Sequence, residues 1–198
     1  MAIHETSPTL IGALWSVDAG SSRLEKAFRI ALLALAGTAL IAISAQISVP
    51  MWPVPMTMQT FAVTLIGAAY GWRLGGATVA LYLAEGAMGL PVFANGGSLA
   101  SFSGPTAGYL FAFVAAAAII GALIEKGWGQ SFFKTTAAMV LATAVIFAGG
   151  IAWLSTFTGL EKALAVGMYP FLIGAGFKIA LAMAVLPMAW KLARIIRK

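Results

Sequence analysis

The chain has 198 residues, of which 61% are hydrophobic and only 9% are charged, and its mean hydropathy is +0.96. Soluble domains carry about 25% charged residues, so this composition excludes a water-soluble globule and indicates a polytopic membrane protein. The chain has no cysteine and one histidine, His4, which excludes disulfides, thiolate metal sites, haem ligation and serine–histidine catalysis. The net charge of +6 is spread thinly over segment ends, without the dense basic patch typical of nucleic-acid binding.

Six apolar runs are read as membrane-spanning helices, each of which normally needs about 20 residues. They cover residues 28–48, 57–71, 74–88, 106–124, 135–157 and 170–192. The expected fold is therefore an all-α integral membrane protein, with residues 1–24 as a polar interfacial tail and residues 25–198 as a single six-helix domain. A cleaved signal peptide is the alternative for the first run, because Ser44-Ala45-Gln46 resembles a cleavage site. The long polar stretch before the run favours an uncleaved anchor.

The positive charges divide unevenly between the two sides of such a bundle. Ten of the twelve basic residues lie on the side that holds both chain ends, Lys162 alone lies on the other side, and Lys178 lies within the last run. Because basic loops stay in the cytoplasm, both termini are expected to be cytoplasmic, in a multi-pass protein of the cell membrane.

The first expected outside loop contains three prolines, a tryptophan and no charge. It reads Val49-Pro50-Met51-Trp52-Pro53-Val54-Pro55-Met56-Thr57-Met58-Gln59. Proline fixes φ and pushes the preceding residue towards extended geometry, so the loop is expected to be stiff and non-helical. It is either an interfacial turn with Trp52 in the aromatic belt or a rigid lid that packs Trp52 against a ligand.

The second outside loop, residues 89–109, is uncharged and glycine-rich and carries Phe93 and Phe102. We expect it to fold back onto the helices, with close backbone approach at its glycines. Asn95 offers two donors and an acceptor to a ligand. Asn95-Gly96 is equally a common turn dipeptide that needs no function.

Two charged side chains, Glu85 and Lys178, lie inside expected spans. A charge at membrane depth costs about 2.5–3.5 kcal/mol on insertion scales, so it normally faces a cavity or a partner. Two interpretations are open. Either an ion pair between Glu85 and Lys178 ties two helices together, or Lys178 meets an anionic or polar ligand in a pocket near the extracytoplasmic side.

A stripe of small residues runs along the first expected helix. Ala27 and Ala31 are four residues apart, as are Ala34, Thr38 and Ala42. Such a stripe lets a second helix approach closely. It serves either packing within the bundle or docking of another membrane subunit, for which Ala27, Ala31 and Ala34 are the candidates.

Four blocks in this order resemble the BioY family, the biotin-binding S components of energy-coupling factor transporters, and the resemblance covers residues 25–195. The blocks are Pro50…Pro53-Val54-Pro55-Met56-Thr57-Met58-Gln59-Thr60, Tyr82-Leu83…Gly86…Gly89-Leu90-Pro91-Val92-Phe93-Ala94, Gly104-Pro105-Thr106…Gly108-Tyr109 and Pro170-Phe171…Gly174…Lys178. The resemblance implies a six-helix bundle that holds biotin, without a cofactor, in an outward-facing pocket under both outside loops. Its implied partners are a transmembrane coupling subunit and two cytosolic ATPases, although some members are thought to work without them.

The chemistry of biotin suits residues in and beside these blocks. Its ureido group matches the amide of Asn95, its apolar part suits Trp52, Phe93 and Tyr82, and its carboxylate could meet Lys178. Further candidate contacts within the blocks are Gln59 and Tyr109.

One position departs from the family pattern. Where the family has an acid three residues before the lysine, this chain has Ala175, and Glu85 is the candidate substitute. Which end of biotin Lys178 contacts is therefore open.

Two other functions compete with this interpretation, namely a self-sufficient carrier of biotin and an S component for another small vitamin. The chain contains no G-x-x-x-x-G-K-[ST] motif, so any ATP must be hydrolysed by partners. With no paired carboxylates, metal ligands or histidine base at depth, it is not expected to be an enzyme. Association of the chain with a second copy is left open.

Overall fold

The computed structural model describes residues 9–14 and 22–196. Its α-helices and strands are α1 (Leu10–Leu14), α2 (Arg23–Gln46), β1 (Ser48–Val49), β2 (Met56–Thr57), α3 (Gln59–Ala87), α4 (Ala107–Glu125), α5 (Phe132–Thr158), α6 (Leu160–Gly167) and α7 (Tyr169–Ile196). Short 3-10 turns lie at Ala94–Gly96, Leu99–Phe102 and Trp128–Gln130. His4 and much of the expected tail lie outside the described residues, and α1 lies within that tail.

Four of these helices are long and apolar enough to cross a membrane among the described residues, at Arg23–Gln46, Ala107–Glu125, Phe132–Thr158 and Tyr169–Lys191. They correspond to four of the six expected runs. Large apolar side chains such as Leu24, Ile173 and Phe177 point outwards from them. In a membrane protein, this outward surface is covered by lipid.

A capping box places the start of α2 five residues before the expected run. The Ser22 hydroxyl accepts a hydrogen bond from the backbone N–H of Glu25 at 3.1 Å, and the Glu25 carboxylate accepts one from the backbone N–H of Ser22 at 2.9 Å. These reciprocal bonds satisfy N–H groups that a helix start leaves unpaired. The Ser-x-x-Glu spacing was a readable signal for this boundary.

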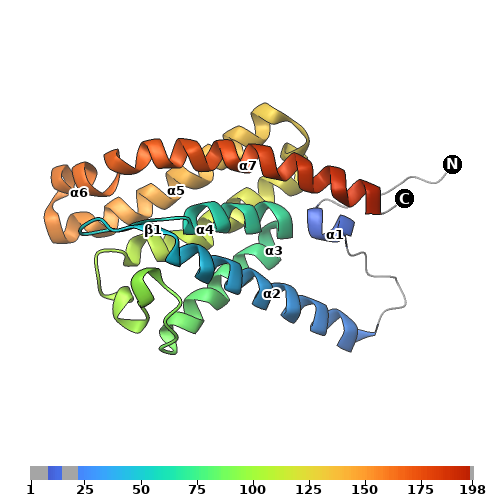
Figure 1. The fold of residues 1–198 in the computed structure, drawn as a ribbon, viewed down its shortest axis with the longest axis horizontal. Coiled ribbons are helices and arrows are strands. Elements are labelled where there is room, and N and C mark those ends of the chain that lie inside the picture. The colour runs from blue at the N-terminus through green and yellow to red at the C-terminus, as the bar shows by residue number, and fades with distance from the viewer. Residues whose placement is uncertain (1–8, 15–21, 197–198) are drawn as a thin grey trace.

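The expected runs 57–71 and 74–88 form one element, α3, which is broken at Gly71. Gly71 has φ +83°, a conformation that L side chains rarely adopt. A Cβ on Gly75 would lie 2.9 Å from the Cα of Gly67, so the second arm of α3 turns back against the first (Figure 1). The carboxylate of Glu125, on α4, accepts the backbone N–H of Trp72 at 3.1 Å and so caps the second arm. Neither arm reaches the usual spanning length of about 20 residues.

The described residues thus form seven α-helices rather than the six expected, because two short helices add to the count while two expected spans merge into α3. One of the additions, α6, lies in the expected outside loop 158–169. It buries Ala163 and Gly167 against its neighbours, and at eight residues it is too short to cross a membrane.

The proline-rich segment is non-helical, as expected, and its ends pair as the antiparallel strands β1 and β2. Figure 1 shows this hairpin, α6 and the loop that follows α3 at one end of the bundle. The helix α1 and the C-terminal part of α7 lie at the other end (Figure 1). The segments that sequence analysis assigned to the outside therefore gather at one end.

Candidate functional site

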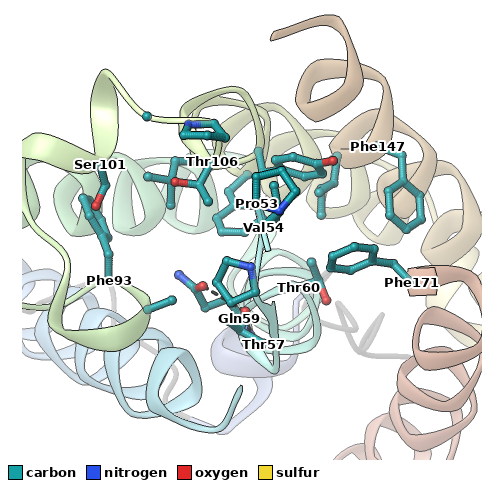
Figure 2. Close-up of a pocket in the computed structure, with 18 of the residues that line it drawn as sticks. Pro53, Val54, Thr57, Gln59, Thr60, Phe93, Ser101, Thr106, Phe147 and Phe171 are labelled. Carbon is teal, nitrogen blue, oxygen red and sulfur yellow. Dashed lines mark hydrogen bonds between the residues drawn. The ribbon is translucent and has the colours of Figure 1, made fainter. Parts of the chain in front are cut away.

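A cavity of about 370 Å³ lies beneath the hairpin and the loop 88–106, a size within the range of small-molecule sites. Its wall combines apolar and aromatic groups with a few polar ones (Figure 2). It is lined by Pro53, Val54, Pro55, Thr57, Gln59, Thr60, Phe93, Ala94, Asn95, Ala100, Ser101, Gly104, Pro105, Thr106, Tyr109, Leu110, Phe113, Thr143, Ile146, Phe147, Phe171, Ala175 and Lys178. Among these lining residues Lys178 is the only charged one.

The Lys178 amine connects α7 to the end of β2 and the start of α3. It donates to the backbone carbonyl of Thr57 at 2.6 Å and to the hydroxyl of Thr60 at 3.1 Å. An ammonium group has three donors, so these two bonds leave one for a ligand. Ala175, one helical turn earlier on the same helix, also lines the cavity but offers no polar group. The cavity wall therefore presents a cation without a counter-ion.

The expected ion pair between Glu85 and Lys178 is absent from the described structure, where Lys178 binds Thr57 and Thr60 instead. Glu85 is half-buried on the second arm of α3 and does not line the cavity. Its proposed role as a substitute for the missing acid has no support in this geometry, because the cavity wall does not include it.

The floor of the cavity is a buried hydrogen-bond network around Gln59. The Thr57 hydroxyl donates to Gln59 Oε1 at 2.9 Å, and Gln59 Nε2 donates to the Tyr82 hydroxyl at 2.8 Å. The Tyr82 hydroxyl in turn donates to the carbonyl of Val92 at 2.8 Å. Gln59 lines the cavity, whereas Tyr82 is 0% exposed and lies one layer behind it. The prediction that Tyr82 packs directly on a ligand does not fit this placement.

The loop 88–106 is anchored by Phe93, which is 2% exposed. The ring of Phe93 packs edge-to-face on Tyr82, with centroids 5.2 Å apart, and on Phe102 at 5.4 Å. Asn95 follows with φ +56°, in the turn geometry that its Asn-Gly dipeptide favours, and it still lines the cavity. Phe93 and Asn95 therefore both line the cavity.

Tyr109 also lines the cavity, and its hydroxyl donates to the carbonyl of Gly167 at 2.8 Å. Gly150 and Gly167 leave room for its ring and hydroxyl, because a Cβ on either glycine would overlap Tyr109. The tyrosine thus connects α4 to α5 and α6 at the cavity wall.

Trp52 is 81% exposed and does not line the cavity. The hairpin covers the cavity through Pro53, Val54 and Pro55 instead (Figure 2). The exposed Trp52 fits the interfacial alternative, and the interpretation in which Trp52 packs against a ligand does not fit this placement.

Several lining residues were not singled out in the sequence. They are mostly small polar or apolar groups, among them Ser101, Thr106, Thr143, Phe147 and Phe171. Thr106 and Phe171 stand inside two of the four blocks and could have been found there. Thr143 and Phe147 lie in an unbroken apolar run, where the sequence carries no signal for which residues face inwards.

Some small residues of the α2 stripe are buried in the bundle and others are exposed. Thr38 is buried and Ala34 and Ala42 are half-buried, while Ala27 and Ala31 are exposed in the described structure. The stripe therefore packs within the bundle only in its second half.

Residues 17–195 match the family model of the BioY family. The chain belongs to the BioY family. A "Biotin transporter BioY" of Thermotoga maritima is 44% identical over 136 residues, which cover 68% of this chain and 79% of the relative. A "Probable biotin transporter BioY" of Pyrococcus horikoshii is 38% identical over 161 residues, or 81% of this chain and 94% of the relative. These BioY relatives are transporters, not enzymes.

The solved structure of an S-component for biotin from an ECF-type ABC transporter has the same fold as this BioY chain. It superimposes with a TM-score of 0.72 at 24% sequence identity, covering 90% of this chain and 96% of that one. The chain is accordingly a mostly helical, multi-pass membrane protein.

The four blocks that resemble BioY all contribute to the cavity wall. Each supplies lining residues, namely Pro53, Val54, Pro55, Thr57, Gln59 and Thr60 from the first, Phe93 and Ala94 from the second, Gly104, Pro105, Thr106 and Tyr109 from the third, and Phe171 and Lys178 from the fourth. Segments far apart in a BioY sequence thus meet around one hollow.

Proposed function

We propose that this chain takes up biotin as the substrate-binding S component of an energy-coupling factor transporter. The observation that carries the proposal is a single cation, Lys178, in an otherwise uncharged cavity of about 370 Å³ to which all four BioY blocks contribute. Biotin is a small acid with an apolar bicycle and a polar ureido group. Such a ligand fits a mostly apolar wall with a few convergent polar groups.

The residues divide between the two ends of this ligand. Lys178 has one N–H free for the carboxylate or for the ureido carbonyl. Asn95 and Gln59 supply amide groups, and Phe93 and Tyr109 supply apolar surface. With Ala175 in place of an acid, the ureido N–H groups need acceptors from Asn95 or the hydroxyls of Ser101, Thr106 and Thr143.

In the proposed topology, the two arms of α3 count as two spans, which with α2, α4, α5 and α7 make six. The positive-inside distribution then places both termini in the cytoplasm of a cell-membrane protein and the cavity at the extracytoplasmic side. Short arms fit this arrangement, because α3 is buried among the other helices and its polar corner is capped by Glu125.

A titration of the purified protein against a panel of small vitamins tests the proposal. Saturable binding of biotin alone is the expected result. Tighter binding of another vitamin would instead indicate a sister S component. Counterflow of labelled biotin into liposomes that contain this protein alone would favour the self-sufficient carrier, because the proposed S component requires its partners for transport.

The exposed half of the alanine stripe on α2 is the proposed docking surface for the transmembrane coupling subunit, which works with two ATPases. Replacing Ala31 by tryptophan is expected to abolish co-purification with the coupling subunit, because a bulky side chain prevents close helix approach. Biotin binding should stay unchanged, since α2 does not line the cavity.

Ala36→Trp is the matched control for this docking prediction. Ala36 is also exposed on α2, but it lies five residues on, roughly 140° around an axis with 3.6 residues per turn. The complex should survive this change. Loss of both assembly and biotin binding in Ala31→Trp would show simple misfolding and contradict a docking role.

A further inference from the structure

Tyr82 connects three segments that are otherwise separate in the chain. Its hydroxyl accepts from Gln59 Nε2 at the start of α3 and donates to the carbonyl of Val92 at the start of the cavity loop, each at 2.8 Å. Both hydrogen-bonding capacities of the hydroxyl are thereby used inside a side chain that is 0% exposed. A buried tyrosine of this kind holds backbone segments in place.

The same network extends to the cation of the site. Lys178 Nζ donates to the Thr57 carbonyl at 2.6 Å, the Thr57 hydroxyl donates to Gln59, and Gln59 donates to Tyr82. In this series of hydrogen bonds each side chain donates to the next residue, in the direction from Lys178 on α7 towards Val92. The three bonds from the Thr57 hydroxyl through Gln59 and Tyr82 to the Val92 carbonyl are continuous, and hydrogen bonds arranged in this way reinforce one another in a low-dielectric interior.

Near Val92 the loop 88–106 is also bonded back to the end of α3, where the Leu90 N–H donates to the Glu85 carbonyl at 3.1 Å. The residue after Val92, Phe93, lies edge-to-face against the same Tyr82 ring, and Gln46 Nε2 donates to the Phe93 carbonyl at 3.1 Å. The far end of the loop is held by Trp153, whose indole N–H donates to the Gly104 carbonyl at 3.0 Å. Between these two points lie the cavity-lining residues Asn95 and Ser101.

We infer that Tyr82 is a positioning residue that holds the loop 88–106 closed over the cavity, and that its bond to Val92 sets how long a ligand stays bound. It acts through the loop without touching the ligand. This inference rests on the proposed biotin function for its ligand, but the hydrogen bond from Tyr82 to Val92 can be tested without biotin.

The first test compares biotin dissociation rates of the purified wild type, Tyr82→Phe and Tyr70→Phe. Tyr82→Phe removes only the hydroxyl and keeps the ring that packs on Phe93. We expect its dissociation rate to rise at least tenfold and its association rate to change less than threefold. Tyr70→Phe also loses a single hydrogen bond, from its hydroxyl to the Leu33 carbonyl at 3.1 Å, but away from the cavity. Its dissociation rate should stay within twofold of the wild type.

The second test reads loop opening without any ligand. Because the chain has no cysteine, Val92→Cys provides a unique thiol at a half-buried position of the loop. Adding Tyr82→Phe to this variant is expected to raise the rate of maleimide labelling at least fivefold, and adding Tyr70→Phe is not. If Tyr82→Phe fails to fold, Thr57→Val should also raise the labelling rate. Thr57→Ser, which keeps the hydroxyl that donates to Gln59, should not.

The outcomes separate this inference from the proposed function. Unchanged dissociation and labelling rates in folded Tyr82→Phe would overturn the inference while biotin binding stands. Equal increases of the dissociation and labelling rates in Tyr70→Phe would also overturn the inference, because they would indicate a general destabilisation of the protein. Absence of biotin binding in the wild type would count against the proposed function alone, because the labelling test needs no ligand.

Discussion

Replacing Lys178 by alanine is expected to weaken biotin binding at least tenfold. Lys178 is the only charged residue of the described cavity lining, and its amine is held there by hydrogen bonds to Thr57 and Thr60. Hydrogen bonds to charged groups contribute about 1.5–3 kcal/mol, and a tenfold loss corresponds to about 1.4 kcal/mol. Calorimetric titration of the purified variant measures the change.

Lys162→Ala is the matched control, because Lys162 is an exposed basic residue on α6 and does not line the cavity. The Lys162→Ala variant tests whether the general attraction of an anion to positive charge accounts for the affinity. Its affinity for biotin should equal that of the wild type. Unchanged biotin affinity in folded Lys178→Ala would show that Lys178 does not contact the ligand.

A neutral ligand analogue shows which end of biotin meets Lys178. If the amine pairs with the carboxylate, the wild type should bind biotin methyl ester more weakly than biotin, whereas Lys178→Ala should bind both alike. If the amine instead donates to the ureido carbonyl, replacing Lys178 by alanine should reduce the affinity for the ester and for the acid by the same factor. This is a double-mutant cycle in which one change is made in the ligand.

Replacing Gly86 by alanine is expected to weaken biotin binding roughly 5- to 150-fold. A Cβ at Gly86 would overlap three atoms of the Phe93 ring. Gly86 lies on the buried face of α3, so the helix backbone cannot move away easily. The Phe93 ring must shift instead and take the cavity loop with it. Overpacking of this kind costs about 1–3 kcal/mol, which gives the expected range of affinities.

Gly76→Ala on the same helix is the control for this change. A Cβ at Gly76 would meet the Ala118 side chain at 3.5 Å, which is an ordinary van der Waals contact. It should leave binding unchanged and, by removing a glycine from a helix, slightly raise the thermal stability. Biotin titration and thermal unfolding of both variants provide the comparison.

A double mutant tests the mechanism of the Gly86 effect. Phe93→Ala removes the ring that the new methyl group would strike, and it is expected to weaken binding by itself. In the Phe93→Ala background, Gly86→Ala should reduce the biotin affinity little further, because the two changes act on one contact. If the losses of binding free energy were fully additive, Gly86 would act through a contact other than that with Phe93.

The sequence alone located most of the helices and the central cation. Residues 106–124, 135–157 and 170–192 were expected to be helical, and α4, α5 and α7 begin within three residues of those starts. These limits are local properties, set by the length of the apolar run and by the charges, prolines and glycines beside it. Lys178 stood out because a charge inside such a run is costly and needs a polar surrounding.

The sharp corner of α3 and the membership of the cavity wall depended on contacts between distant segments. The corner needs Glu125 of α4 to cap Trp72, a residue 53 positions away. Tyr82 and Glu85 belong to the same block as Phe93, yet only Phe93 reaches the cavity. Thr143 reaches it from a helix whose sequence marks no inner face.

The physical reason is that lipid and protein interior are both apolar. In a soluble protein, hydrophobic periodicity shows which side of a helix is buried, whereas here Ile173 and Phe177 face outwards while Phe171 faces the cavity. Composition and run length therefore determined that this chain is a helical membrane protein with a cation, Lys178, inside its last apolar run. The rotation of each helix, set by close packing at glycines and by buried hydrogen bonds, decided which side chains surround that cation.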